Sequence, residues 1–380
     1  MPKCPKRLLL LGAGHAHLET IAASRLFTSR GFELVVVAPG EFWYSGGAAA
    51  VLSGARRLED NVIDVATLTE RGGGRFLPGW VETIDPIERS VLVRGGTSIG
   101  YDVLSINLGS EVPTWTIPGL ATWSLPVKPM SNLLLIRDCL RAASNAQLQR
   151  PLRLVVLGGG ATACEIAGNL LGLVNRESAR AQITVVTSGP RLLESWPRRA
   201  GRIAANSLQQ RGGSICLGAR VTSVEDGGLS VEGGQRIPFD RLIAAIGLVP
   251  NRVIRSAGLP LDHRGALVVD EHLRSVAAPQ VFGGGDCVSV QGWEVPAVGV
   301  HGVRQAPILR HNLLAALEGS SERGLASFRP QTNFLQILNL GDGTGLASWG
   351  SYTCHSPLAL FWKDWIDRRF LERYRLPSDC

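Results

Sequence analysis

Two glycine turns in this chain have the residue types and the spacing that bind nucleotide phosphates. Gly12–Ala13–Gly14 follows an apolar run at 9–11, and Gly158–Gly159–Gly160 follows an apolar run at 155–157. In such a strand–turn–helix unit, glycine lets backbone N–H groups approach a pyrophosphate, and the positive end of the helix favours its charge. A single turn of this kind often arises by chance, so the indication lies in the repetition.

Each glycine turn has a companion segment later in the chain. Tyr101–Asp102–Val103–Leu104 leads to Gly109, and Phe239–Asp240–Arg241–Leu242 leads to Gly247. The interval between the two aspartates is the length of a domain, so the repeated unit is larger than a short motif. The sequence therefore predicts an α/β fold with two Rossmann-like dinucleotide-binding domains, in which Gly109 and Gly247 also contact the nucleotides.

The composition is typical of a globular enzyme and excludes a disordered chain, since 45% of the 380 residues are apolar and 19% are charged. The net charge of +7 permits anionic partners such as phosphates or lipid surfaces, but its spread along the chain does not imply nucleic acid. The seven cysteines have neither C-x-x-C pairs nor metal-ligand spacing, which predicts reduced thiols, no metal site and a cytoplasmic location. No apolar stretch approaches the roughly 18 residues of a membrane span.

The first turn departs from the usual fingerprint at its third glycine position. The chain continues as Gly14–His15–Ala16–His17, so that His17 stands where a third glycine would allow close helix–strand packing. We expect His17 either to pack there or to reach over the bound cofactor. The next strand, 33–38, ends without the acid that would hold an adenosine ribose, and Glu41 is a substitute close by.

A distant segment identifies the first nucleotide. Val281–Phe282–Gly283–Gly284–Gly285–Asp286 is a short apolar strand, a glycine turn and a carboxylate. Gly-Asp turns are common, but this one resembles the motif by which flavoproteins with two dinucleotide domains hold the ribityl chain of FAD through the aspartate. We therefore predict FAD as the cofactor, held by Gly12, Gly14, His15, Ala16, His17, Tyr44, Gly109 and Asp286.

Further segments extend this likeness: residues 12–17, Tyr44–Ser45–Gly46, Val127–Lys128–Pro129, residues 299–305 and residues 362–370. With them the whole chain resembles the two-dinucleotide-domain flavoproteins related to type II NADH dehydrogenases and to the mammalian ferroptosis-suppressor quinone reductases. The branch it resembles most consists of NADH-dehydrogenase-like flavoproteins found alone or fused to selenide, water dikinase. The likeness is specific for fold and cofactor, and much less so for the substrate.

By this resemblance, the second turn binds NAD(P)H, which gives a hydride to the flavin and leaves. The positions assigned to this co-substrate are Gly158, Gly160, Thr162, Ala163 and Gly247. Glu165 matches an acid that the family uses beside the nicotinamide ribose and carboxamide, although an acid early in a helix also complements the helix dipole. The segment from Ala297 and Val298 onward is expected to start a helix whose positive end faces the flavin pyrimidine.

The choice between NADH and NADPH is expected at the end of the strand 183–187. An acid there would accept hydrogen bonds from the ribose 2′-hydroxyl and repel a 2′-phosphate. The chain instead has Thr187, Ser188 and then Arg191, and hydroxyls with a guanidinium suit a phosphate. This favours NADPH or dual use, unless Arg191 is only a solvated turn residue.

The route of the electrons is restricted by the cysteines. The stretch 42–47, where glutathione-reductase-like relatives carry a C-x4-C disulfide, has no cysteine, so disulfide exchange of that kind is excluded. Cys139, Cys164 and Cys354 superficially match the widely spaced cysteines of sulfide:quinone reductases, but Cys164 lies inside the second fingerprint helix. We therefore expect direct transfer from the flavin to a diffusing, quinone-like acceptor.

Two residues are candidates for a catalytic role in that transfer: Lys128 near the flavin ring and Gln305 near the acceptor pocket. Both could instead be ordinary surface or interdomain residues. Two other functions remain open: a pathway-specific flavin reductase or oxidase for a small biosynthetic or selenium/sulfur substrate, and a flavoprotein without turnover that acts as a redox sensor or partner protein.

The expected domain order is an FAD domain at 1–118 and 265–326, an inserted NAD(P)H domain at 119–264 and a C-terminal interface segment at 327–380. Residues 356–371 are predicted to be helical, with aromatic residues among basic ones. This composition would permit peripheral contact with the inner membrane surface. The acids Asp364, Asp367 and Glu372 oppose strong attraction to anionic lipid, so we favour a helix docked on its own core or on the partner of a homodimer.

Overall fold

The computed structural model describes residues 5–145, 149–294, 296 and 298–375, and two five-stranded parallel sheets form its core. The first sheet has the strand order β21 (Val281–Gly283), β9 (Val103–Ile106), β1 (Arg7–Leu11), β2 (Glu33–Ala38) and β5 (Arg75–Pro78). The second has the order β11 (Ser124–Pro126), β18 (Arg241–Ala244), β12 (Leu152–Leu157), β13 (Ala181–Val186) and β14 (Ser214–Cys216). The central strands are apolar runs because parallel sheets are covered on both faces.

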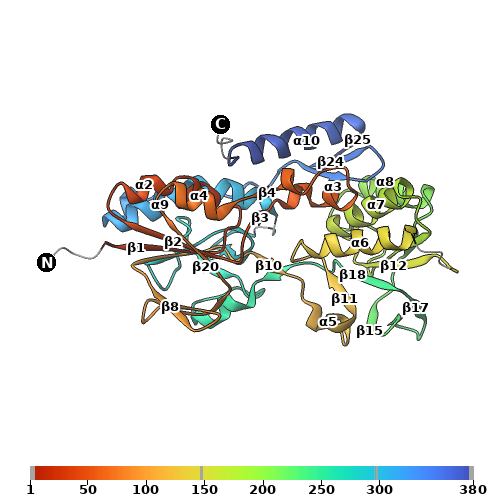
Figure 1. Ribbon diagram of the computed structural model, residues 1–380, viewed down its shortest axis with the longest axis horizontal. Helices are drawn as coiled ribbons and strands as arrows, with labels where there is room; N and C mark the ends of the chain where they lie inside the picture. The colour runs from red at the N-terminus through yellow and green to blue at the C-terminus, as the bar shows by residue number, and fades with distance from the viewer. Residues whose placement is uncertain (1–4, 146–148, 295, 297, 376–380) are drawn as a thin grey trace.

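In each half, helices lie on one side of the parallel sheet and a small antiparallel sheet lies on the other (Figure 1). The helices beside the first sheet are α1 (Leu18–Ala22), α2 (Ser24–Thr28), α4 (Val65–Arg71) and α9 (Gly299–Glu318). Those beside the second are α6 (Asn132–Asn145), α7 (Ala161–Arg176) and α8 (Arg198–Gln210). The antiparallel sheets are β6 (Val81–Asp85), β7 (Ser90–Val93) and β8 (Thr97–Gly100) in the first half, and β15 (Val221–Glu225), β16 (Gly228–Val231) and β17 (Arg236–Pro238) in the second.

The two halves repeat the same backbone contacts, which confirms the predicted pair of domains. Asp102 Oδ2 accepts a hydrogen bond from the backbone N of Arg7 at 2.7 Å, and Asp240 Oδ2 accepts one from the backbone N of Arg153 at 2.8 Å. Each aspartate therefore fixes the start of the strand that leads into a glycine turn. The repeat visible in the sequence is a repeat of tertiary contacts.

The chain crosses between the halves through a short antiparallel pair, β10 (Ser110–Glu111) and β19 (Val249–Pro250). After β19 the chain is already back in the first half, because Ile254 and Ala257 belong to the same apolar core as β1. The domain boundary expected at 264 stays a prediction. Conversely, α3 (Ala48–Leu52) packs against α6 and α7 of the second half.

The C-terminal segment joins the two halves. It forms a sheet of β23 (Gln336–Asn339), β24 (Gly345–Trp349) and β25 (Tyr352–Ser356), followed by α10 (Pro357–Glu372), which runs along the top of the molecule in Figure 1. Leu338 and Leu346 pack in the core of the second half, whereas Phe370 and Leu371 pack in the core of the first. Ser356 accepts a hydrogen bond from Ala359 N (3.1 Å) and caps the predicted helix.

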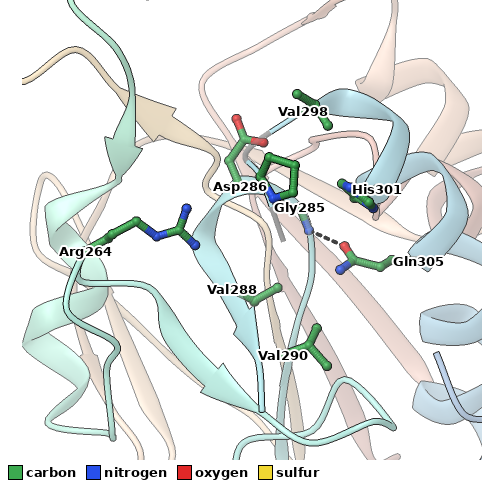
Figure 2. A pocket seen from close by; sticks show the side chains of 9 residues that line it. Arg264, Gly285, Asp286, Val288, Val290, Val298, His301 and Gln305 are labelled. Carbon is green, nitrogen blue, oxygen red and sulfur yellow. Dashed lines mark hydrogen bonds between the residues drawn. The ribbon is translucent and has the colours of Figure 1, made fainter. Parts of the chain in front are cut away.

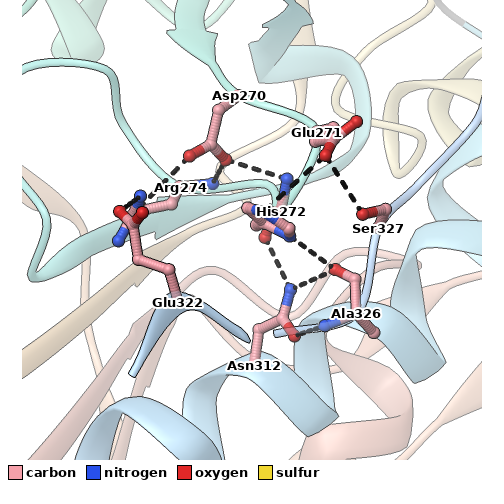
Figure 3. Close-up of polar contacts among 8 residues, drawn as sticks. All are labelled: Asp270, Glu271, His272, Arg274, Asn312, Glu322, Ala326 and Ser327. Atoms are coloured by element: carbon pink, nitrogen blue, oxygen red, sulfur yellow. Dashed lines mark hydrogen bonds and ion pairs between the residues drawn. The ribbon is translucent and has the colours of Figure 1, made fainter. Parts of the chain in front are cut away.

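A buried asparagine fastens the chain that leads from α9 into this segment (Figure 3). Asn312 Nδ2 donates to His272 O (2.8 Å) and to Ala326 O (2.9 Å), and its Oδ1 accepts from Ala326 N (2.8 Å). Beside it, Arg274 pairs with both Asp270 and Glu322. These contacts attach residues 322–327 to the loop before β21.

We expect Asn312→Ala to lower the free energy of unfolding by about 2 kcal/mol, because it leaves buried backbone groups of His272 and Ala326 without partners. Urea unfolding followed by circular dichroism measures the loss. Asn206→Ala, at an exposed site on α8, is the matched control. Equal stability of the two variants would contradict a clamping role for Asn312.

Candidate active site

Two glycine turns from distant parts of the chain pack together at the carboxyl end of β1. Gly12 has a φ of +81°, and a β-carbon there would lie 2.3 Å from the carbonyl oxygen of Asn107. A β-carbon on Gly284 would lie 2.6 Å from Cβ of Ala16. Such approaches require glycine, so the turn after β1 and the turn after β21 form one backbone cradle.

The side chain of Asn107 lies between the two turns. β-carbons on Gly14 and on Gly285 would each lie 2.6 Å from its Oδ1, and the residue is 3% exposed. Its Nδ2 is buried and has no hydrogen-bond partner in the part of the chain that the structure describes. An unsatisfied buried donor costs roughly 1–3 kcal/mol. The cradle therefore fits a ligand whose phosphate or hydroxyl oxygens accept from this amide.

Asp286 and Lys128, far apart in the sequence, meet at the rim of the cradle. Asp286 Oδ2 accepts from Ser110 Oγ at 2.6 Å and from Lys128 Nζ at 3.3 Å, and Lys128 also donates to Ser110 Oγ at 2.7 Å. Burial alone would raise the pKa of Asp286, but the Lys128 ammonium and these hydrogen bonds outweigh it and hold the pKa below its usual range. The carboxylate is therefore charged and anchored, with Oδ1 outside these bonds.

His17 is held inside the first turn. Its Nδ1 lies 2.6 Å from Gly12 O and its Nε2 lies 2.7 Å from Ser105 Oγ, and the side chain is fully buried. Burial lowers the pKa of His17 to about 4, against the raising effect of the Gly12 contact. Because both ring nitrogens are bonded within the protein, the geometry favours packing over a reach across the cofactor.

His15 belongs to an aromatic cluster that α10 completes. Its ring centroid lies 4.9 Å from that of Phe42, 5.8 Å from that of Tyr44 and 5.6 Å from that of Phe370. Tyr44 stacks on Phe370 with 4.8 Å between centroids. Burial lowers the pKa of His15 to about 4, although the Asp286 carboxylate opposes the shift. The C-terminal helix is therefore part of the wall of the site.

Buried charges fix α10 against this wall. Lys363 Nζ donates to Gly46 O (2.6 Å) and to Asp367 Oδ2 (3.0 Å), and the Tyr44 hydroxyl donates to Asp367 Oδ1 (2.9 Å). Asp367, one of the acids considered to oppose attraction to lipid, is buried, since its side chain is only 6% exposed. Sequence reasoning missed the role of Lys363 and Asp367, although their spacing of four residues in a helix is a signal for an ion pair.

The start of α9 closes another side of the cradle (Figure 2). Gln305 Oε1 accepts a hydrogen bond from Gly285 N at 2.7 Å, so this side chain supports the turn that carries Asp286. His301 lines the same pocket, and neither of its buried ring nitrogens has a partner among the described residues. Val298 is the N-cap of α9, whereas Ala297 lies outside the described residues.

The second glycine turn resembles the first but is more open. A β-carbon on Gly158 would lie 2.2 Å from Ala245 O, whereas one on Gly160 would meet no atom within 4 Å. The helix α7 begins directly after Gly160, and no side chain caps it. Its first N–H groups are therefore free to bind a phosphate.

The other positions assigned to the nucleotides are compatible with these turns. Gly109 and Gly247 have positive φ angles of +69° and +104°. Thr162 is exposed in the first turn of α7, and Ala163 is buried beneath it.

Glu165, also on α7, faces the C-terminal segment. Its Oε1 accepts a hydrogen bond from Asn339 N at 2.7 Å. Burial raises the pKa of Glu165, opposed by the charge of Lys363 and increased by that of Asp367. A carboxyl group in such surroundings holds a proton closer to neutral pH than a solvated one.

Two alternatives were considered for Arg191: a phosphate ligand with free donors or a solvated turn residue. The structure shows neither. Its guanidinium donates to the carbonyl oxygens of Leu193 (2.8 Å), Glu194 (2.5 Å) and Trp196 (2.9 Å). Ser188 is exposed, and Thr187 is buried. Of the donors proposed for a 2′-phosphate, the Arg191 guanidinium is therefore engaged in folding the loop after β13, whereas Ser188 stays exposed.

The three cysteines considered for a relay lie on α6, α7 and β25. Cys164 is fully buried, and burial raises the pKa of its thiol to about 12. A thiol of this kind is a poor nucleophile because the reactive species is the thiolate. In the described residues, no group of three or more His, Cys, Asp or Glu side chains is arranged to hold a metal ion.

Residues 6–306 match the family described as pyridine nucleotide-disulphide oxidoreductases. The matched region contains both glycine turns and the turn that ends in Asp286, and only the C-terminal segment extends well beyond it.

Curated relatives include the external alternative NAD(P)H-ubiquinone oxidoreductase B1 of Solanum tuberosum, which is 24% identical over 75% of this chain and 55% of the relative. The chain thus spans about half the length of that protein. The demethylphylloquinone reductase NdbB of Synechocystis sp. is 25% identical, over 82% of this chain and 76% of the relative.

Two solved structures show the same fold at low identity. NDH2 of Plasmodium falciparum in complex with NADH is 14% identical, with a TM-score of 0.85 and 97% of each chain covered. The sulfide:quinone oxidoreductase of Aquifex aeolicus is 17% identical, with a TM-score of 0.79. The match covers 97% of this chain and 91% of the oxidoreductase.

Proposed function

Because the chain belongs to the pyridine nucleotide-disulphide oxidoreductase family, we propose that it is an FAD-dependent oxidoreductase that takes a hydride from NAD(P)H and passes two electrons to a quinone-like acceptor. The observation that carries the proposal is the pair of matching glycine turns, one supplied with the Asp286 carboxylate and the other left open. A tightly held cofactor suits the first, and a co-substrate that leaves suits the second.

The first turn, Asn107 and Asp286 hold the FAD. The backbone at Gly12 and Gly14 approaches the pyrophosphate, and the Asn107 amide donates to an oxygen of the cofactor. Asp286 accepts hydrogen bonds from the ribityl hydroxyls, and Lys128 keeps it charged. FAD, when bound, takes up the hydride of NAD(P)H and returns two electrons to the acceptor.

The second turn, with Gly158, Gly160 and the start of α7, binds the pyrophosphate of NAD(P)H. Glu165 lies on the side of this site that faces α10. Reduction of a quinone to its hydroquinone consumes two electrons and two protons, of which the hydride supplies one proton. Glu165 can hold the other, because burial and the nearby Asp367 carboxylate raise its pKa, against the opposing charge of Lys363.

The quinone-like acceptor is favoured by the relatives, whose names specify ubiquinone and demethylphylloquinone. In this chain, the aromatic rings of Phe42, Tyr44 and Phe370 pack together in the wall of the site and give it the apolar character that suits such an acceptor.

Steady-state oxidation of NADH and NADPH by the purified holoenzyme, with a panel of ubiquinone, naphthoquinone and selenium or sulfur acceptors, tests the proposal. We expect turnover with at least one quinone. Turnover confined to a selenium or sulfur compound would support a pathway-specific reductase, and no turnover with any acceptor would support a redox sensor or partner protein.

We expect the combined substitution of Cys139, Cys164 and Cys354 by serine to leave reoxidation of the reduced protein by a soluble quinone within a few-fold of wild type. Direct transfer needs no thiolate, and a few-fold change corresponds to about 1 kcal/mol of indirect packing effects. Stopped-flow absorbance measures the rate. A variant that binds FAD, is reduced by NAD(P)H and cannot pass electrons on would contradict direct transfer.

The outer face of α10 supports a peripheral contact with a membrane. The residues of this face lie between the buried positions of α10. The large apolar residues exposed on it are Leu358, Phe361, Trp362, Trp365 and Ile366. Rings on an amphipathic helix beside arginines are typical of segments that lie in the lipid interface. In the described part of the chain, no helix is long and apolar enough to cross a membrane.

The wild-type protein is therefore expected to float with liposomes that contain anionic lipid, and the double variant Trp362→Glu/Trp365→Glu to remain in the dense fraction. Trp80→Glu, another exposed tryptophan, serves as the control. If the double variant instead changes the mass measured by light scattering and leaves flotation unchanged, the face belongs to a homodimer.

A further inference from the structure

From the loop after β13, we infer that Glu194 selects NADH over NADPH by supplying the carboxylate that the end of β13 lacks. The inference rests on the proposed function, since it assumes that a dinucleotide binds at the second glycine turn. It concerns a residue that the sequence pattern does not single out, because Glu194 lies well beyond the end of the strand.

The position in question is defined by the fold. In a Rossmann-like domain, the acid that binds the adenosine ribose follows the second strand of the unit, beside the glycine turn. Here that strand is β13, which ends at Val186 and is followed by buried Thr187. A β-carbon on Gly159 would lie 2.6 Å from Thr187 Oγ1, so the end of β13 touches the glycine turn directly.

The loop that follows folds back onto the same turn. Leu193 N donates to Gly159 O at 2.8 Å, with Leu193 in the left-handed region at a φ of +52°. Arg191 holds this conformation by donating to three carbonyl oxygens within residues 193–196. The arginine is therefore a positioning residue of the loop rather than a phosphate ligand.

This fold places the carboxylate of Glu194 at the end of β13. Its Oε2 lies 2.9 Å from the position that a β-carbon would take on Gly189, and Thr187 Oγ1 lies 3.6 Å from the same position. Glu194 is exposed, and no ion pair engages it among the residues that the structure describes. Its charge is thus available to a ligand.

A carboxylate at this place has opposite effects on the two dinucleotides. It accepts hydrogen bonds from the ribose hydroxyls of NADH, and it repels the phosphate that replaces the 2′-hydroxyl in NADPH. Arg198 and Arg199, exposed at the start of α8, are the nearest cations in the sequence that could favour the phosphate. The balance between these two arginines and Glu194 decides whether NADH or NADPH binds more tightly.

Isothermal titration of the oxidised holoenzyme with NAD⁺ and NADP⁺ tests the inference. We expect the wild type to bind NAD⁺ at least about tenfold more tightly, Glu194→Gln to weaken NAD⁺ binding about tenfold, and Glu194→Arg to prefer NADP⁺. Glu232→Gln, an exposed acid on the hairpin between β16 and β17, should change neither constant.

A second variant tests whether Arg191 positions the loop or binds the 2′-phosphate. Arg191→Ala should weaken NAD⁺ binding about as much as Glu194→Gln does, because it releases Glu194. A loss confined to NADP⁺ would overturn the inference, as would a wild type that prefers NADP⁺ or a Glu194→Gln variant with unchanged constants. If neither dinucleotide binds the wild type, the proposed function fails and the inference fails with it.

Discussion

Asp286→Ala is expected to weaken FAD binding about a hundredfold, which corresponds to about 3 kcal/mol. The variant loses a charged acceptor for the cofactor's hydroxyls. It also leaves the Lys128 ammonium, which is 3.3 Å from Asp286 Oδ2, partly buried without its partner. Titration of the apoprotein with FAD, followed by flavin fluorescence, measures the dissociation constant.

Two further variants make this result specific. Asp286→Asn keeps the shape and some hydrogen bonding, so its loss should be smaller than that of Asp286→Ala. Asp226→Ala, an exposed aspartate of the other domain, should bind FAD like the wild type. Wild-type affinity in the folded Asp286→Ala protein, or a colourless wild type that takes up no added FAD, would show that the cradle serves another ligand.

His17 is expected to make the protein less stable as the pH falls below neutral. Its pKa is about 4 in the folded protein and about 6.5 in the unfolded chain. Between these values the unfolded chain binds the proton and the folded protein does not, so stability falls with pH. The loss begins near pH 6.5, amounts to about 2 kcal/mol at pH 5 and approaches about 3 kcal/mol below pH 4.

Urea unfolding at pH 7 and pH 5 measures this effect. His17→Gln removes the titrating group, so its loss of stability between the two pH values should be smaller than that of the wild type by about 2 kcal/mol. His263→Gln, at an exposed site, should retain the full wild-type loss. The same pH dependence in the wild type and the His17 variant would mean that folding does not lower the pKa of His17, so that the buried side chain can take up a proton.

Local patterns predicted the parts of the fold that repeat. The strands before Gly12 and Gly158 are apolar because parallel strands are buried on both faces, and Asp102 and Asp240 hold the starts of those strands. The meeting of the Asp286 turn with the first glycine turn was likewise expected, since a family resemblance linked the two segments. The predicted α10 also forms, almost within the expected bounds.

Contacts between distant segments were not predictable in the same way. Nothing near Gln305 in the sequence indicates that its amide would accept from Gly285 N, or that Lys363 would reach Gly46 O. Arg191 has the residue type that a phosphate requires, but three carbonyl oxygens of its own loop satisfy its donors. Residue type gives the chemistry that a side chain can perform, and only the tertiary fold decides which partner it meets.

Anaerobic reduction and reoxidation of the purified protein, followed by visible absorbance, tests the central claim most directly. The account predicts a flavin spectrum that bleaches with about one equivalent of NADH or NADPH and recovers when a soluble quinone is added without oxygen. A flavin that neither nicotinamide bleaches, or a bleached flavin that no quinone restores, would contradict it.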